Sequence, residues 1–212
     1  MQLIGMLDSP YVRRVAISLR LLGIPFEHRA VSVFSTFEQF RQINPVVKAP
    51  SFICDDGEVL MDSTLILDYA EALAALGRSL MPSGIAERQH ALRIIGLALA
   101  ACDKSVQIVY ERNLRPVKKQ HQPWLERIRG QLLAACAALE HEIHRNSPGA
   151  NSKTIKQAGI TSAVTWQFMQ MMLPEVVMAS AYPALQTWSA QAEQLAEFKA
   201  FPPLGPGVTV HQ

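Results

Sequence analysis

The chain has 212 residues, of which 49% are hydrophobic and 18% are charged, and its formal net charge is +2. The hydrophobic fraction is enough for a substantial core, and the length allows one large domain or two small ones. So small a net charge gives no overall field for a nucleic acid or a membrane surface. The sequence has no signal-peptide pattern and no apolar run long enough to span a bilayer, so we expect a cytoplasmic protein without nucleic-acid or membrane partners.

Three cysteines, Cys54, Cys102 and Cys136, occur singly in apolar surroundings. Their spacing predicts buried reduced thiols, and it fits neither a disulfide framework nor a zinc site. His141 and His144 lack the His-Glu-x-x-His spacing of a metal-binding helix, so we interpret them as surface residues. The sequence therefore predicts no metal site.

The first third of the chain alternates between strand and helix patterns. Gly23, with Pro25 just beyond it, predicts the end of the first helix, and Asp55-Asp56-Gly57 predicts a hairpin turn. The expected strands cover 2–6, 26–33, 51–54 and 59–61, and the expected helices cover 11–22, 37–43 and 63–76. This β-α-β-α-β-β-α order predicts a compact sheet with helices on both faces.

After Gly77 the strand patterns stop, and apolar residues recur at the three-four spacing of packed helices. The expected helices cover 86–111, 123–146, 160–173 and 183–195, followed by a proline-rich extended tail. A basic group in a polar stretch predicts a solvated connection between two of these helices; its members are Arg112, Arg115, Lys118 and Lys119. The predicted fold class is α/β plus all-α, with domains at 1–77 and 86–212 joined by a linker at 78–85.

Ser9 ends a short apolar segment and comes directly before Pro10, a residue favoured at the first position of a helix. A serine there can cap the helix, and its hydroxyl and the free amides can also hold a thiolate. The two interpretations are thus a structural cap and a thiol-activating site. The four residues Ser9-Pro10-Tyr11-Val12 carry no cysteine at either end, which excludes the dithiol exchange of thioredoxins and glutaredoxins.

Two further motifs follow in order: Lys48-Ala49-Pro50 before a strand, and Asp62-Ser63 before a helix. Together with the Ser9 turn, they make the chain resemble the cytosolic glutathione S-transferase superfamily, in the bacterial branch with serine at the first-helix cap. The resemblance covers nearly the whole chain. It implies a thioredoxin-like N-terminal domain followed by an all-helical domain, with glutathione as co-substrate.

The resemblance also implies roles for the residues of the second and third motifs. The bond before Pro50 is expected to be cis, and the backbone of Ala49 is expected to pair with the cysteinyl part of glutathione. Ser63 and its amide would hold the γ-glutamyl carboxylate, and Asp62 would hold the amino group. Lys48 is a plausible partner for a glutathione carboxylate, and the alternative for it is a lone surface lysine.

Ser9 would donate a hydrogen bond to the glutathione sulfur and favour its thiolate, the nucleophilic form. Arg13 would add positive charge to this region, and Asp8 would oppose the thiolate. The resemblance implies a second pocket, between the domains, for a hydrophobic electrophile. Its candidate residues are Tyr11, Phe34, Tyr110 and Trp166.

The main hypothesis is a dimeric glutathione transferase that detoxifies small hydrophobic electrophiles. The alternatives are a binding or regulatory module of the same fold, and another glutathione-dependent reaction such as peroxide reduction or isomerisation. One departure concerns Lys156 and Gly159, which occupy the places where many relatives have a Ser/Thr cap and an Asp. We expect this departure to lower stability more than activity.

Overall fold

The computed structural model describes residues 1–146, 149 and 151–208. The chain divides into two compact units. The first unit combines Met1–Leu80 with the C-terminal segment that begins at Ala196, and the second unit is Met81–Leu195. The predicted domains differ from this division in two respects. The C-terminal segment was expected to belong to the helical domain, and the predicted linker 78–85 is divided between the two units after Leu80.

The first unit is built on a small mixed sheet of four strands in the order β2-β1-β3-β4. β1 pairs with β2 in parallel, and β3 runs antiparallel to both β1 and β4. Because β3 reverses direction, the carboxyl ends of β1 and β4 lie at the same edge of the sheet as the amino end of β3. The strand bounds are β1 (Gln2–Ile4), β2 (Glu27–Arg29), β3 (Ser51–Ile53) and β4 (Val59–Met61).

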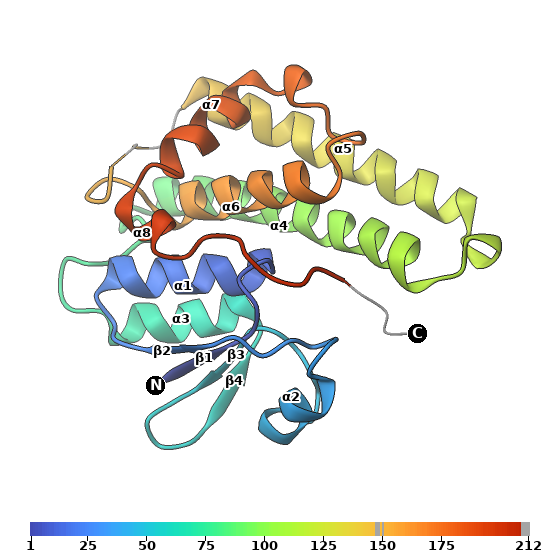
Figure 1. Ribbon diagram of the computed structural model, residues 1–212. Helices are drawn as coiled ribbons and strands as arrows, with labels where there is room; N and C mark the ends of the chain where they lie inside the picture. Colours follow the sequence, from blue (N-terminus) through green and yellow to red (C-terminus); the bar gives the residue numbers. More distant parts are fainter. Residues whose placement is uncertain (147–148, 150, 209–212) are drawn as a thin grey trace. The chain divides into compact units, whose positions relative to one another are not determined.

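Helices cover both faces of this sheet, as predicted. α1 and α3 pack on each other over one face, and α2 packs on the other face through Phe40, which is buried with Ile4 and Val31 (Figure 1). The bounds are α1 (Pro10–Leu22), α2 (Phe37–Ile43), α3 (Ser63–Leu73) and, in the C-terminal segment, α8 (Ala196–Lys199).

The second unit is helical. α6 is its core helix: nearly every residue from Gln157 to Met169 is buried, and the helix packs against both α4 and α7. The bounds are α4 (Ile85–Leu114), η1 (Val117–Lys119), α5 (Gln122–Arg145), α6 (Gln157–Met172), η2 (Ala179–Ala181) and α7 (Pro183–Ala192). The chain is thus a thioredoxin-like domain followed by a helical domain, which confirms the predicted fold class.

The largest difference from the predicted elements is the second strand, expected over 26–33 and found only over Glu27–Arg29. Its partner β1 has three residues, so the ladder ends where β1 ends. Beyond it, the Ser32 hydroxyl accepts hydrogen bonds from two following backbone amides, which turn the chain toward α2. The third helix ends at Leu73, before the predicted residue 76, whereas the left-handed Gly23 ends α1 as predicted.

All three cysteines are buried and free, as predicted. Burial raises the pKa of the Cys136 thiol to about 12. Among the described residues, no group of three or more His, Cys, Asp or Glu side chains is placed to hold a metal ion, and no helix is long and apolar enough to cross a membrane.

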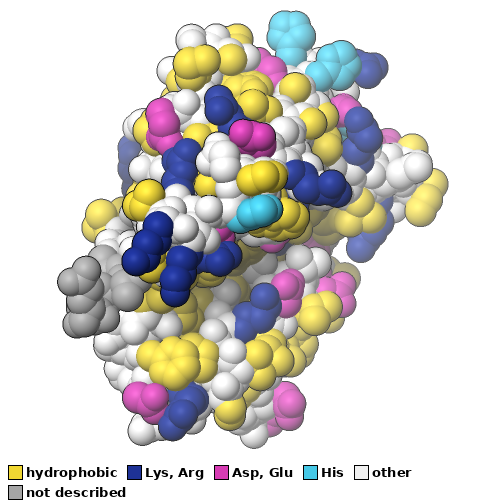
Figure 2. Space-filling view, turned by 90° about the vertical axis from the view of Figure 1, so that its right-hand side faces the viewer, with side chains coloured by type: hydrophobic (Ala, Val, Ile, Leu, Met, Phe, Trp, Pro, Cys, Tyr) yellow, Lys and Arg dark blue, Asp and Glu magenta, His cyan; other side chains and the backbone are white. Residues whose placement is uncertain are grey.

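Three members of the basic group, Arg115, Lys118 and Lys119, lie on the exposed connection between α4 and α5, as predicted, whereas Arg112 lies in the last turn of α4. Arg112 pairs with Glu175, and Arg115 lies 3.4 Å from a Glu111 carboxylate oxygen. Figure 2 shows Lys and Arg side chains interspersed with Asp and Glu side chains over the visible face. The ion pairs of Arg112 and Arg115 reduce the positive charge of the basic group.

Candidate functional site

Ser9 occupies the N-cap position of α1, with an extended backbone at φ −73° and ψ 120°. Its carbonyl accepts the first helical hydrogen bond, from the Arg13 amide at 3.0 Å. Its hydroxyl, however, makes no capping hydrogen bond, so the expectation of a side-chain cap is wrong. Pro10 presets the helical backbone and needs no amide partner, so α1 begins without help from this hydroxyl. The Ser9 hydroxyl is therefore available to a ligand.

The Ala49–Pro50 bond is cis, which confirms the conformation implied by the resemblance. The β1–β3 ladder ends at the pair Ile4 and Ser51, so Ala49 lies just beyond the paired strand. Its side chain packs close to Gly5, where an added Cβ would lie 3.3 Å from the Ala49 Cβ. This contact brings the second motif to the end of β1, from which the chain leads to Ser9.

Asp62, and not Ser63, is the N-cap of α3. An Asp62 carboxylate oxygen accepts a hydrogen bond from the Thr64 amide at 2.9 Å, and Ser63 is the first helical residue. Asp62 has φ 72°, a conformation that non-glycine residues rarely adopt. Residues with such strained backbones cluster at functional sites. The turn presents Ser63 at the start of the helix, where free amides favour an anion.

The three motifs therefore meet at one edge of the sheet. Ser9 follows the carboxyl end of β1, Pro50 precedes the amino end of β3, and Ser63 follows the carboxyl end of β4. Lys48 is exposed beside them, and its carbonyl accepts a hydrogen bond from the Ser51 hydroxyl at 2.8 Å. This edge combines a hydroxyl, a strand-like backbone and a helix N-terminus.

A buried arginine at this edge is absent from the sequence-based predictions. Arg14, on α1, is only 3% exposed, and its Nη1 donates to the Ser63 hydroxyl at 3.1 Å. The two residues are 49 positions apart, so no local motif joins them. The only sequence signal is an arginine within the apolar face of a helix.

Arg13 and Asp8, expected to act on the thiolate, both contact the C-terminal segment. The Arg13 Nε donates to the Phe201 carbonyl at 2.8 Å, and its guanidinium lies 5.6 Å from the centre of the Phe198 ring. The Asp8 carboxylate accepts a hydrogen bond from the Gly207 amide at 2.8 Å. Both charged side chains are thus held by this segment.

The four candidate electrophile-pocket residues are divided between the two units. Tyr11 and Phe34 are half-buried in the first unit, and Tyr110 is partly exposed on α4 in the second. Trp166 is 3% exposed, and its ring meets that of Tyr182 edge-on at 6.0 Å, so it is a core residue of the helical unit.

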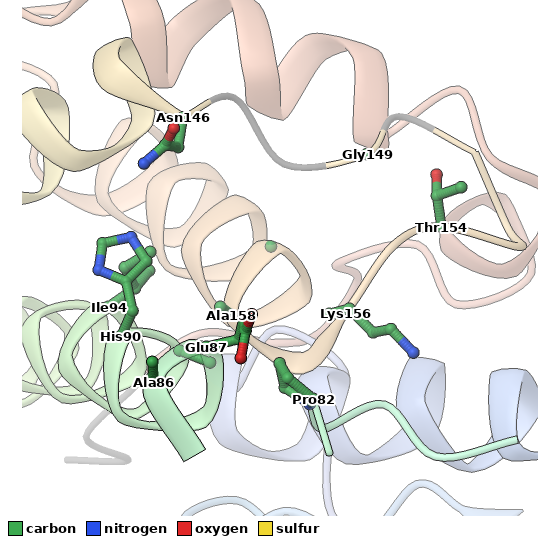
Figure 3. Close-up of a pocket in the computed structure, with 12 residues that line it drawn as sticks. Pro82, Ala86, Glu87, His90, Ile94, Asn146, Gly149, Thr154, Lys156 and Ala158 are labelled. Carbon is green, nitrogen blue, oxygen red and sulfur yellow. The ribbon is translucent and has the colours of Figure 1, made fainter. Parts of the chain in front are cut away.

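The second unit contains a cavity of about 440 Å³, between the start of α4, the end of α5 and the start of α6. Glu87 and His90 project from α4 beside Ala158 of α6 (Figure 3). The other described residues that line this cavity are mostly small or apolar, and they also belong to the second unit. The three motifs are in the first unit, whereas the described residues that line this cavity all belong to the second.

Comparisons with known proteins find similarity in both sequence and fold. Residues 3–78 match the family described as the glutathione S-transferase N-terminal domain. A GST-like protein of Escherichia coli K12, YibF, is 26% identical over 174 residues, which are 82% of this chain and 85% of YibF.

Two solved structures share the fold of the whole chain. A glutathione S-transferase of Methylobacterium radiotolerans, in complex with glutathione sulfonate, has a TM-score of 0.88 at 23% identity and covers 100% of this chain and 98% of its own. A glutathione transferase family member of Pseudomonas fluorescens Pf-5, with bound S-(propanoic acid)-glutathione, has a TM-score of 0.80 at 28% identity, over 97% of this chain and 100% of its own. Residues 3–78 thus match the glutathione S-transferase N-terminal domain, and the fold of the whole chain is similar to that of these glutathione transferases.

Proposed function

We propose that the protein is a glutathione transferase that activates the glutathione thiol for attack on a small hydrophobic electrophile. The observation that carries the proposal is the meeting of Ser9, the cis Ala49–Pro50 bond and the Asp62–Ser63 turn at one edge of the sheet. Glutathione is an extended tripeptide with a thiol between two charged ends. It needs a backbone to pair with, an anion site and a donor for sulfur, and this edge offers each.

In this proposal, glutathione pairs through its cysteinyl backbone with Ala49, and its γ-glutamyl carboxylate binds the start of α3 at Ser63. The Asp62 oxygen not used by the Thr64 amide receives the γ-glutamyl amino group, and Lys48 meets a carboxylate of the tripeptide. The Ser9 hydroxyl donates to sulfur. A hydrogen bond to the charged form lowers the thiol pKa and raises the fraction of nucleophilic thiolate at neutral pH.

The experiment that tests this role is Ser9→Ala. Loss of one hydrogen bond to an anion is expected to raise the pKa of bound glutathione and to lower the turnover of a model electrophile about tenfold or more at neutral pH. The pKa is read from the ultraviolet absorbance of the bound thiolate across a pH series. Ser83→Ala, at an exposed position of the second unit, is the matched control. An unchanged thiol pKa in Ser9→Ala would exclude the proposed catalytic role.

The alternative from another class is a binding or regulatory module that keeps this fold without chemistry. Calorimetry with glutathione separates it from the transferase, because a pure scaffold has no saturable binding at millimolar ligand. Peroxide reduction and isomerisation use the same thiolate and differ only in the second substrate. A panel containing an aryl halide, an organic hydroperoxide and a cis-enedione distinguishes conjugation from these reactions.

We further propose a cytoplasmic homodimer. The buried free cysteines favour a reducing compartment. In the first unit, Met61 and Leu65 expose apolar side chains, with Leu65 63% exposed. Burial of such side chains in a self-association is favourable, and light scattering of the purified protein reports its mass directly.

A further inference from the structure

Arg14 connects α1 to the first turn of α3. Its guanidinium Nη1 lies 3.1 Å from the Ser63 hydroxyl oxygen and 3.4 Å from the Thr64 hydroxyl oxygen. Both Arg14 and Ser63 are 3% exposed, so the contact is shielded from bulk water. The positive charge of Arg14 is thereby held in contact with the first turn of α3.

This contact fixes the direction of the Ser63 hydroxyl. A guanidinium has donors only, so the Ser63 oxygen must accept from Arg14. The proton of the hydroxyl then points to another acceptor, and among the described residues none receives it. Ser63 is thus arranged as a donor, which suits a ligand that only accepts hydrogen bonds, such as a carboxylate.

The charge of Arg14 acts in the same direction. A hydroxyl that accepts from a cation is polarised and becomes a stronger donor. The guanidinium also adds positive potential to that of the first-turn amides of α3. A carboxylate at this position therefore gains from both effects, whereas an uncharged group gains little from the potential.

We propose that Arg14 is a positioning residue that orients and polarises Ser63 to select the α-carboxylate at the γ-glutamyl end of glutathione. The inference rests on the proposed function, because it assumes that glutathione binds at this edge. Arg14 acts through Ser63 and needs no contact with the ligand. Lysine is expected to replace it only in part, because its flexible side chain and compact, strongly hydrated ammonium lack the fixed donor geometry of the guanidinium.

The test compares two ligands by calorimetry: glutathione, and 4-aminobutyryl-cysteinyl-glycine, which lacks only the α-carboxylate. The wild-type protein is expected to bind glutathione about tenfold or more tightly than the analogue, since hydrogen bonds to charged groups have this magnitude. Arg14→Met is expected to lose most of this preference by weakening glutathione binding alone. Its KM for glutathione should rise while kcat at saturating glutathione stays close to that of the wild-type protein.

Arg13→Met is the matched control, because it removes the neighbouring buried guanidinium on the same helix without touching Ser63. It should leave the preference between the two ligands unchanged. Ser63→Ala should lower the preference, because the hydroxyl donor is lost while the first-turn amides remain. Adding Arg14→Met to it should cause a smaller further loss than Arg14→Met causes in the wild-type protein, as expected for residues that act together. Arg14→Lys is a milder change and is expected to keep part of the preference for glutathione over the analogue. If Arg14→Met does not fold, the preference measured for Arg14→Lys tests the inference.

Retention of the wild-type preference in the Arg14 variants would overturn the inference, and so would equal losses for both ligands. A wild-type protein that binds neither ligand would overturn the proposed function itself, and with it this inference. A third outcome separates the two proposals. If the wild-type protein binds glutathione and the Arg14 variants keep the same preference between the two ligands, the proposed function stands and only the role of Arg14 is excluded.

Discussion

Gly5 controls how closely the end of β1 approaches its neighbours. It has φ +141°, and an added Cβ would lie 2.5 Å from a methyl group of Val12 and 3.3 Å from the Ala49 Cβ. Both the backbone conformation and the space thus require glycine. We expect Gly5→Ala to lower the free energy of unfolding by about 2 kcal/mol or more, as measured by urea denaturation.

Gly57 provides the control for Gly5, because it also has a positive φ, at +91°, but an added Cβ would meet nothing within 4 Å. Gly57→Ala should therefore show the conformational cost alone, about 1 kcal/mol. Equal losses in the two variants would contradict the packing role of Gly5. A larger loss at Gly5 would show that the end of β1 is held by close packing next to the cis Ala49–Pro50 bond.

Glu142 makes the stability of the helical unit depend on pH. A hydrogen bond from Arg93, at 2.8 Å, lowers the pKa of this buried carboxyl below its ordinary value, with Arg93 and His90 charges acting in the same direction against desolvation. A folded-state pKa below the unfolded one stabilises the fold above the unfolded pKa. That stabilisation is lost as the pH falls through the lowered folded pKa.

Glu142→Gln should therefore be less stable than the wild-type protein near neutral pH, by about 1 kcal/mol because Arg93 is largely exposed. The difference should shrink as the pH falls to about 4 and below. Urea denaturation at several pH values measures it. Glu126→Gln, an exposed position on the same helix, should show a difference that stays small at every pH. A Glu142 effect independent of pH would contradict the ion pair as its cause.

At the scale of elements, α6 begins without the Ser/Thr cap that many relatives have at this position. Lys156 is its N-cap, with an extended backbone at φ −118° and ψ 169°, and makes no side-chain cap. A serine adopts this backbone readily and can accept from the Gly159 amide. We expect Lys156→Ser to raise the free energy of unfolding by about 0.5–1 kcal/mol.

The control for this cap is Lys153→Ser, which removes an exposed lysine three residues earlier and outside the helix. It should leave the midpoint of urea denaturation close to that of the wild-type protein. A similar gain from both substitutions would assign the effect to lost positive charge. A gain from Lys156→Ser alone would assign the effect to the new cap at the start of α6.

The sequence predicts elements well where the signals are local. α2 and β4 have the predicted bounds, since Asn44-Pro45 ends one and the Asp55-Asp56-Gly57 turn positions the other. β2 is shorter than predicted because its length depends on its partner, which no residue of 26–33 encodes. Element ends set by tertiary pairing are thus less predictable than those set by turns.

The same distinction applies to the candidate site. The three motifs are short turns before helices or strands, so the sequence locates Ser9, Pro50 and Ser63. Arg14 could not be found in this way, because its contact with Ser63 spans 49 residues and depends on the packing of α1 against α3. The residues in the turns can be predicted from the sequence, whereas the contact of Arg14 with Ser63 can be identified only from the folded structure.

At the scale of the whole chain, Met1–Leu80 and the described part of the C-terminal segment from Ala196 build the first unit together. Arg13 is 1% exposed and donates to the Phe201 carbonyl across 188 positions, and the Phe201 ring stacks on Phe26 at 5.7 Å. Gly205 approaches Asp8 so closely that an added Cβ would lie 2.2 Å from its carboxyl group. The C-terminal segment therefore supports the turn that carries Ser9.

This arrangement predicts that Phe201→Ala destabilises the first unit even though residue 201 is far from the sheet in sequence. Loss of a partly buried ring and its stacking partner is expected to lower the free energy of unfolding by about 2 kcal/mol. Leu204→Ala is the matched control, because Leu204 lies in the same segment and is 69% exposed. Hydrogen exchange measures the effect locally: amides of α1 should exchange faster in Phe201→Ala and at wild-type rates in Leu204→Ala. Unchanged exchange of α1 in Phe201→Ala would mean that the segment lies on the first unit without stabilising it.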